Sequence, residues 1–354
     1  MYSCKRHSNS RPALRGGLLA LLAALLFGLS TPLVQRFGVG VGPFTTAAVL
    51  YGGAAAAGVL SRRRVEREAR VMRSELSRLL AMAAFGAVLG PVALAWGLQR
   101  TSATSASLML TLEAVFTALL AWRLCRETMD GRVWTAMLLL LAGGMLLVLD
   151  QGRDGGAQLL GLLAVLLATA AWAVDNSLSR ALAERDPGQV VMFKAALGAC
   201  AAALVALAAG ETLPRPSALL ALWLIGATGY GLSLHCYLLA QRAFGAARTG
   251  SVFAFAPFIG AAFAMLLGER PAGWMLAAGS ALMLAGVLLH LAESHSHEHT
   301  HAAMEHEHAH RHDDGHHDHA HDTMPAGEHS HVHRHRPLQH AHPHVPDAHH
   351  LHRH

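Results

Sequence analysis

The amino-acid sequence predicts an all-α integral membrane protein with ten transmembrane helices in two inverted five-helix repeats, followed by a disordered His-rich tail. Three observations predict this fold class: the composition, apolar stretches that recur along the chain, and a long internal repeat. The chain is 53% hydrophobic and only 14% charged. A soluble chain of 354 residues would carry more charge on its surface, so we expect a chain that lies in lipid.

Apolar stretches of about 20 residues are long enough, at roughly 1.5 Å per residue, to cross a hydrocarbon core of roughly 30 Å. The first follows basic residues, as in a signal peptide, but no cleavage pattern of small residues follows it, so we expect an uncleaved helix. The predicted spans are 16–35, 43–60, 79–98, 103–122, 131–149, 157–178, 190–209, 219–240, 247–267 and 272–292.

Lys and Arg are unevenly distributed between alternate loops. With a cytoplasmic N-terminus, the inside segments hold 18 basic residues, seven of them in SRRRVEREARVMRSELSR, and the outside loops hold five. Basic residues near helix ends are retained in the cytoplasm. We therefore expect a multi-pass protein of a bacterial inner membrane with both termini cytoplasmic.

The internal repeat lies in the centre of the chain. GLQRTSATSASLMLTLEAVFTALLAWRLCRETMDGR aligns without a gap with LAQRAFGAARTGSVFAFAPFIGAAFAMLLGERPAGW, which begins 142 residues later. The rarer coincidences pair Gln99 with Gln241 and Glu127 with Glu269. Both glutamates stand at helix ends beside basic residues, where we expect them to cap helices or form salt bridges.

A unit of five spans ends on the opposite side from its start, so the second copy must enter the membrane upside down. We expect a cytoplasmic N-terminus at 1–15, the first repeat at 16–149, the second at 157–292 and the tail at 293–354. Inverted repeats around a midplane site are an architecture of secondary transporters. No G-x-x-x-x-G-K-[ST] loop is present, so we expect transport without ATP, no enzymatic activity and no nucleic-acid partner.

Each half has a small-residue helix that ends in L-x-x-E, in LCRET at 124–128 and LLGER at 266–270. This pattern resembles the EamA family of the drug/metabolite transporter superfamily over about residues 16–292, and with the tail it is similar to a bacterial subgroup of that family. The resemblance implies transport of a small molecule, no required cofactor, and a central cavity lined mainly by spans one, three, four, six, eight and nine. It leaves the substrate open, because the family handles amino acids, nucleotide-related metabolites and drugs.

Polar residues within the spans are candidates for substrate binding, because a charge in the bilayer is costly. Glu113 lies deepest, in span four, where it could bind a proton or a cation. Asp175 and Asn176 lie toward the inner end of span six, and His235 lies in span eight. Pro257, in FAFAPFIG, frees backbone carbonyls and is expected to mark a bend that lines the cavity.

Each candidate also has a structural interpretation. Asp175 and Lys194 lie near the same face on adjacent spans, so a structural ion pair is an alternative to ligand binding. His235 could be hydrogen-bonded inside the bundle. Glu113 stands in the region where the second half has Phe255 and then Pro257, so a bend in span four stays open.

The tail from residue 295 to the end holds 23 of the 26 histidines of the chain and nine Asp or Glu residues. Such a segment cannot bury enough apolar surface to fold alone. Neutral imidazoles suit Zn, Ni and Co, whereas the H-E-x-x-H matches in this tract are chance products of its composition. The candidate metal ligands are His295, His297, His299, His301, His306, His308, His310, His312, His316, His317, His319 and His321.

The sequence thus predicts a secondary transporter that exports a small solute by alternating access and carries a metal-responsive tail. Two alternatives stay open: a divalent-metal or metal-chelate exporter fed by the tail, and a membrane-tethered metal store or sensor. A pH-responsive tail, or a tail with no role in transport, is also open. The expected partners are membrane lipid, a small-molecule substrate and divalent metal ions, with a homodimer open.

Overall fold

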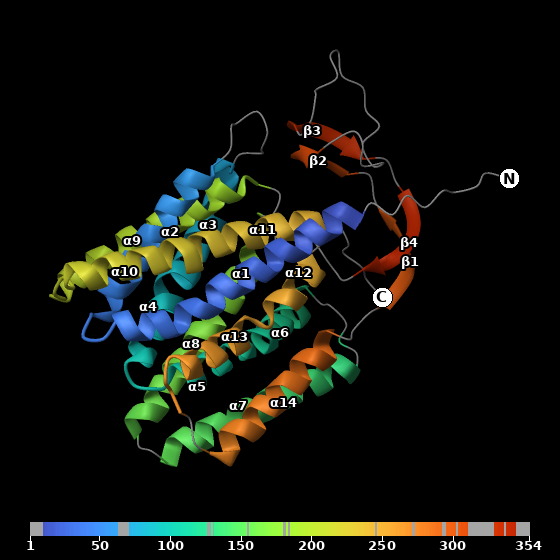
Figure 1. Ribbon diagram of the computed structural model, residues 1–354. Coiled ribbons are helices and arrows are strands. Elements are labelled where there is room, and N and C mark those ends of the chain that lie inside the picture. The colour runs from blue at the N-terminus through green and yellow to red at the C-terminus, as the bar shows by residue number, and fades with distance from the viewer. Residues whose placement is uncertain are drawn as a thin grey trace.

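The computed structural model describes residues 10–62, 71–125, 129, 131–153, 156–179, 182, 185–244, 246–270, 273–291, 295–301, 304–310, 329–335 and 338–344. Figure 1 shows long helices that run side by side in a bundle. The strands of the tail complete the described elements.

The first half of the chain forms five helical segments, of which the third and fourth are interrupted. The third contains a π-helical stretch and the fourth a 3₁₀ stretch, which both break the regular α-helical hydrogen bonding. The elements are α1 (Ser10–Phe37), α2 (Pro43–Ser61), η2 (Arg73–Glu75), α3 (Leu76–Met82), η3 (Ala83–Leu89), α4 (Gly90–Leu98), α5 (Ala103–Met109), η4 (Leu110–Leu112), α6 (Glu113–Cys125) and α7 (Gly131–Arg153).

The second half repeats this order, with a π-helical stretch in its third segment and a break in its fourth. The break is a two-residue turn at 254–255, and Pro257 follows it in the first turn of the next helix. The elements are α8 (Gly156–Ser179), α9 (Pro187–Ala208), α10 (Pro216–Ile225), η6 (Gly226–Leu232), α11 (Ser233–Phe244), α12 (Ala246–Phe253), α13 (Ala256–Leu266) and α14 (Trp274–Leu291).

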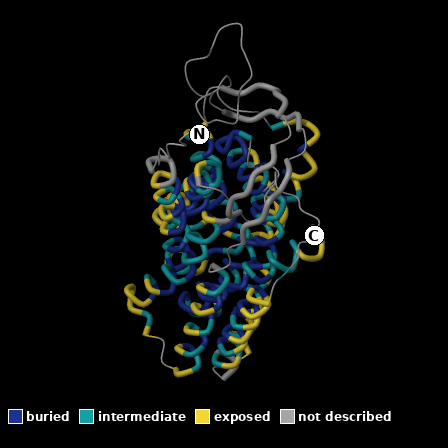
Figure 2. The backbone as a smooth tube through the Cα atoms, turned by 90° about the vertical axis from the view of Figure 1, so that its right-hand side faces the viewer, coloured by how far each residue is buried: buried dark blue, intermediate teal, exposed yellow. Residues whose placement is uncertain are grey.

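Within the described residues, nine helical stretches are long and apolar enough to cross a membrane, and the tenth, Trp274–His290, is a shorter apolar helix. The outer surface of the bundle is apolar: Leu60, Leu207 and Leu266 are each at least 76% exposed. Figure 2 shows the buried residues along the middle of the bundle and many exposed ones on its outer turns. An apolar exterior fits lipid, so the predicted all-α membrane fold is confirmed.

Helix packing in one half has a counterpart in the other. α1 packs on α11 and η6, as α8 packs on α4 and η3. α1 also packs on α12 and α13, as α8 packs on α6. The pairs α2 with α9 and α7 with α14 join equivalent helices of the two halves. This pattern is what a pseudo-two-fold axis between two repeats produces.

The two halves run in opposite directions through the bundle. Arg100 lies at one end, where it lines a large cavity together with Arg36. Its repeat counterpart Arg242 lies at the other end, where its guanidinium donates to the carbonyl oxygen of Arg185. Since helix direction alternates along the chain, the fold has the inverted arrangement that an odd number of spans requires.

The tail contains four strands, β1 (His295–His301), β2 (Met304–His310), β3 (His329–His335) and β4 (Leu338–His344). β1 pairs antiparallel with β4, and β2 pairs antiparallel with β3. Period-two sequences such as HSHEHTH have the repeat of an extended strand, which is compatible with this backbone pairing.

Candidate central cavity

A cavity of about 70 Å³ lies inside the bundle between helices of both halves. α1, α2 and α6 contribute to its walls from the first half, and α8, α9, η6, α11 and α12 from the second. Spans two and seven thus line it in addition to most of those that the family resemblance implied. Its charged, amide and aromatic lining residues are Phe27, Tyr51, Glu113, Trp172, Asp175, Asn176, Lys194, Tyr230, Tyr237 and Phe253.

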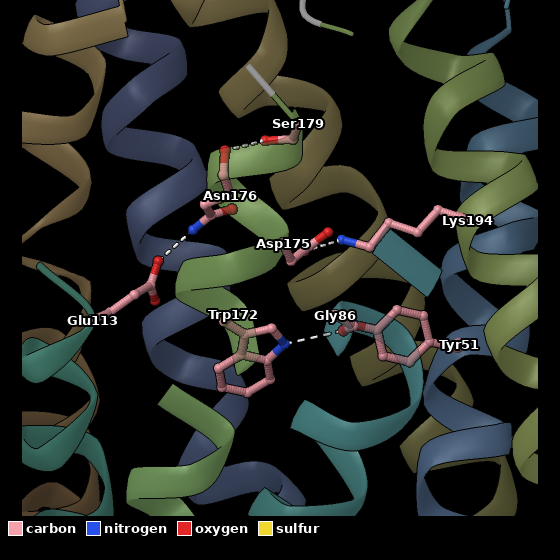
Figure 3. Close-up of polar contacts among 8 residues, drawn as sticks. All are labelled: Tyr51, Gly86, Glu113, Trp172, Asp175, Asn176, Ser179 and Lys194. Carbon is pink, nitrogen blue, oxygen red and sulfur yellow. Dashed lines mark hydrogen bonds and ion pairs between the residues drawn. The ribbon is translucent and has the colours of Figure 1, made fainter. Parts of the chain in front are cut away.

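Two adjacent residues of α8 hold the polar side chains of the cavity in place. The Asp175 carboxylate forms an ion pair with the ammonium of Lys194 on α9, and both side chains are almost fully buried. The amide of Asn176 donates a hydrogen bond to Oε1 of Glu113 on α6. Figure 3 shows these two contacts on opposite sides of α8. α8 therefore links Glu113 of the first half to Lys194 of the second half through its own side chains.

The second oxygen of Asp175 is different. Its Oδ1 atom is buried and has no hydrogen-bond partner among the described residues. Buried polar atoms are usually paired, since an unpaired one loses its hydration without compensation. Because this oxygen has almost no accessible surface, it is an unsatisfied acceptor enclosed in the packing beside the cavity.

The π-helical segment η3 supplies an acceptor beside the cavity. The carbonyl oxygen of Gly86 accepts from the Tyr51 hydroxyl and, at 3.0 Å, from Nε1 of Trp172. A π-helical turn removes the regular i to i−4 pairing and thereby frees a carbonyl for side chains. Figure 3 shows both rings turned toward this carbonyl. One backbone oxygen thus orients two aromatic walls of the cavity.

The aromatic rings form a continuous wall. Phe27 contacts Trp172, Tyr230 and Phe253, with ring centroids 5.8, 5.9 and 5.4 Å away. Tyr237 packs edge-on against Phe253 at 5.0 Å. Such edge-to-face arrangements favour a rigid wall, because each ring limits the rotation of its neighbours. The cavity is therefore apolar on one side and charged on another.

Glu113 occupies the break in the fourth span. It is the first residue of α6, directly after the 3₁₀ segment η4. The sequence left a bend in span four open, and the structure has a 3₁₀ interruption of the α-helix there, although no proline stands at this position. The equivalent break in the second half follows Phe253, so interrupted helices of both repeats meet the cavity.

Two of the predicted site residues do not line the cavity. Pro257 marks a break, as predicted, but its side chain is buried in the first turn of α13, and Phe253 lines the cavity before the break. His235 is half-buried on α11 and lies between the lining residues Leu234 and Tyr237 without lining the cavity itself. Glu113, Asp175 and Asn176 are brought together, so three of the five candidates share one cavity.

The sequence reasoning missed the aromatic lining, and it left Lys194 open between a structural ion pair and a ligand role. A signal for these residues was present in their spacing. Trp172 precedes Asp175 and Asn176 by three and four residues, and Tyr230 precedes Tyr237 by seven. These spacings place side chains on one face of a helix. A search for aromatic residues on the faces of the charged candidates could have found part of this wall.

A second, larger cavity of about 950 Å³ lies at the end of the bundle that holds Arg100. Glu269 lines it and caps α5, where its carboxylate accepts from the backbone N–H groups of Ala103 and Thr104 at 2.8 and 2.9 Å. The capping role expected for Glu269 is thereby confirmed. Its repeat counterpart Glu127 lies outside the described residues.

The predicted metal ligands of the tail are only partly described. His295, His297, His299 and His301 fall in β1, and His306, His308 and His310 in β2. Among the residues that the structure describes, no group of three or more His, Cys, Asp or Glu side chains is arranged to hold a metal ion. The remaining candidates, His312, His316, His317, His319 and His321, lie outside the described residues.

Comparison with known proteins agrees with this geometry. An uncharacterized transporter from Methanothermobacter thermautotrophicus is 28% identical over 232 residues, which cover 64% of this chain and 68% of the relative. A crystal structure whose description names no function matches with a TM-score of 0.54 and 19% identity, covering 77% of this chain and 94% of the other. At that identity the likeness concerns the fold alone.

The family comparison covers both repeats. The model of the EamA-like transporter family matches residues 14–149 and again residues 159–292. Transporters of this family need no cofactor, and they work in contact with lipid and a small-molecule substrate. The chain belongs to the EamA-like transporter family and is a multi-pass membrane transporter of solutes.

Proposed function

We propose that this protein exports a small organic solute across a bacterial inner membrane by alternating access, with the central cavity as the substrate site. The observation that carries this proposal is the meeting of interrupted helices from both repeats at one cavity. η4 of the first half and the turn at 254–255 of the second half adjoin it. Interrupted helices at the interface of inverted repeats are where secondary transporters bind substrate.

The direction of transport follows from the orientation that we propose. Arg62, Arg123, Arg185 and Arg242 stand at the ends of helices on one side of the bundle. Their side is the cytoplasmic one if basic residues are retained inside. The cavity lining includes Asp175 and residues near the same ends of their helices, which supports loading from the cytoplasm. The repeats at 16–149 and 157–292 would then exchange conformations around the cavity, without any enzymatic step.

The chemistry of the cavity favours an organic solute over a divalent metal ion. Among the residues that the structure describes, its lining includes two carboxylates but no His or Cys side chain. Carriers of Zn, Ni or Co would use imidazole or thiolate ligands in the span region. We therefore assign the metal interaction to the tail, which would sense cytoplasmic metal and tune transport. Metal-chelate export and a membrane-tethered metal store are the competing proposals, and a homodimer is compatible with each.

Alternating access can be tested without knowing the substrate. In a protein whose native cysteines are replaced, Ala54→Cys places a thiol in the central cavity and Val39→Cys places one in the large end cavity. A membrane-impermeant maleimide is applied to right-side-out and to inside-out vesicles. The native cysteines to replace are Cys4, Cys125, Cys200 and Cys236.

We expect the maleimide to label Val39→Cys from one side of the membrane and Ala54→Cys from both sides. The control variant Val39→Cys has an exposed site, so its one-sided labelling checks that the vesicles are sealed and oriented. Labelling of Ala54→Cys from a single side under every condition would mean that the cavity does not alternate between the two sides.

A further inference from the structure

The central cavity has an imbalance of charge that its own residues do not correct. Its described lining includes two carboxylates, Glu113 and Asp175, and one basic side chain, Lys194. The formal charges of these three side chains sum to one negative. Lys194 is already paired with Asp175, so the carboxylate of Glu113 is the group without an ionic partner among the lining residues.

A neutral hydrogen bond does not replace that partner. Asn176 donates its amide to one oxygen of Glu113, which orients the carboxyl group but supplies no opposite charge. Isolated charges in a low-dielectric interior are costly and are normally paired. A ligand with one positive charge would supply the missing partner.

The aromatic wall indicates which kind of cation fits. Phe27, Trp172, Tyr230 and Phe253 are joined by ring contacts and line the same cavity as Glu113. Aromatic faces attract ammonium groups through their quadrupole and pack against the alkyl carbons next to them. An inorganic cation would instead need several oxygen ligands, which an aromatic wall does not provide.

The volume limits the size of the ligand. About 70 Å³ is room for roughly five waters, if one water needs roughly 10 to 15 Å³ of such space. The pairing of Lys194 with Asp175 also leaves no free ammonium among the lining residues for the carboxylate of a zwitterion or an organic anion. A small amine without a carboxylate meets both conditions.

We propose that the central cavity selects a small organic cation, whose ammonium group pairs with Glu113 while its carbon atoms pack against the aromatic wall. This inference rests on the proposed function, because it takes the cavity as the substrate site.

Binding to the purified full-length protein in detergent tests the proposal. The probes are tetramethylammonium and butylammonium, with butanol, butyrate and leucine as neutral, anionic and zwitterionic comparisons. Affinity is measured by calorimetry and by the shift of Tm at fixed pH and ionic strength. We expect the two ammonium ions to bind and each comparison compound to bind at least about tenfold more weakly, as a charge pair in a buried site requires.

Two variants assign the binding to named groups. Glu113→Gln keeps the shape and the contact with Asn176 and should weaken ammonium binding at least about tenfold. Phe253→Leu should weaken it roughly 3- to 30-fold, because it removes an aromatic face and keeps the apolar volume. The matched control is Glu211→Gln, since that carboxylate caps α2 through the N–H of Thr45 and does not line the cavity.

The outcomes separate this inference from the proposed function. Equal ammonium binding by Glu113→Gln, tighter binding of butyrate or leucine, or no ammonium binding by a folded wild-type protein would overturn the inference. Flux of the same ammonium ions into proteoliposomes is then measured. Ammonium binding without flux would overturn transport through this cavity and leave its selectivity intact. Flux of a neutral solute without ammonium binding would overturn the selectivity for cations and leave the proposed transport function intact.

Discussion

The two π-helical segments occupy equivalent places in the two repeats but face different chemistry. η3 and η6 each have a glycine at the fourth position, Gly86 and Gly229. A methyl group on Gly86 would lie 2.2 Å from a carboxylate oxygen of Asp175 on α8. One on Gly229 would lie 2.5 Å from Cβ of Ser30 on α1. The equivalent π-helical glycines thus lie against an ion-paired carboxylate in one repeat and against a neutral serine in the other.

This difference shows that the symmetry belongs to the backbone and not to the charges. With the repeat offset of the sequence, Glu113 corresponds to Phe255, so this carboxylate has no charged counterpart in the second half. In the proposed mechanism, exchange of conformations between repeats needs equivalent hinges, and the π segments and the broken fourth spans occupy equivalent places in both repeats. Binding of one substrate would need only one set of charges. We therefore propose that the two repeats share their hinges and differ in the charged groups that they bring to the cavity.

Orientation of the repeats gives the largest expected difference, because it is all or none. Reporter fusions after Arg100 and after Arg242 should read opposite sides of the membrane, with Arg242 on the cytoplasmic side. Paired alkaline phosphatase and fluorescent-protein fusions measure this. If both fusions report the same side of the membrane, the result contradicts the inverted repeat.

Breaking the ion pair between Lys194 and Asp175 should have the largest effect on stability. Lys194→Met leaves the buried Asp175 carboxylate without its partner, which typically costs about 3 to 5 kcal/mol. The double variant with Asp175→Asn should recover a large part of this loss, because no unpaired charge remains. Tm in detergent is measured for the two single variants and the double variant. The double-mutant cycle built from these stability changes checks both values.

Ser30→Ala is the matched change in the other repeat. The Ser30 hydroxyl donates to the carbonyl oxygen of Phe27 at 2.6 Å, so its removal should cost about 1 kcal/mol or less. An equal loss of stability for Ser30→Ala and Lys194→Met would remove the contrast between the neutral surroundings of Gly229 and the charged surroundings of Gly86.

Adding a methyl group to either glycine should have an intermediate effect. Gly86→Ala and Gly229→Ala both overpack a close contact, which costs about 1 to 3 kcal/mol. The responses should diverge when Asp175 is replaced by Ala, because that change removes the atoms that a methyl on Gly86 would meet. Melting curves of the two glycine variants, of Asp175→Ala and of the two double variants test this. An unchanged cost of Gly86→Ala in the Asp175→Ala background would contradict the assigned contact.

Much of the fold could be predicted because lipid imposes length and polarity on each span. The ten apolar stretches, the repeat and the break near Pro257 all follow from local sequence. The π segments could not be predicted, since Ala- and Gly-rich stretches such as AAFGAVL are compatible with a regular α-helix. They arise from tertiary packing, in which Trp172 and Tyr51 pair with a carbonyl that a regular helix would use internally.

The site could be predicted in part, and the reason differs between residue types. Glu113, Asp175 and Asn176 were found because polar groups in a span need a partner or a function. The aromatic residues were missed because Phe and Trp suit a lipid-facing position as well as a buried one. Their presence in a span therefore does not indicate whether they face lipid or the interior of the bundle. His235 was a polar residue in a span as well, but it is not among the residues that line the cavity.

A smaller effect is expected for the two donors that share the Gly86 carbonyl. Tyr51→Phe or Trp172→Phe alone should cost about 0.5 to 1.5 kcal/mol, because the carbonyl keeps one donor. The double variant should cost more than the sum, since it leaves the buried carbonyl unpaired. A double-mutant cycle on Tm measures this coupling, and strictly additive losses would show that the two rings are held independently.

The smallest effect on the bundle is expected for removal of the tail, which contrasts most with the spans in composition. Truncation after Glu293 should leave Tm in detergent unchanged within error and all spans inserted, because the apolar segments end before that residue. A metal-sensing tail should nevertheless change how Zn or Ni alters transport or growth, and the difference should vanish below about pH 6, where imidazoles protonate. A matched variant with the tail histidines replaced by Gln separates metal binding from length. If both variants match the full-length protein at every metal concentration, the tail has no role in transport, and the central cavity alone determines what the protein carries.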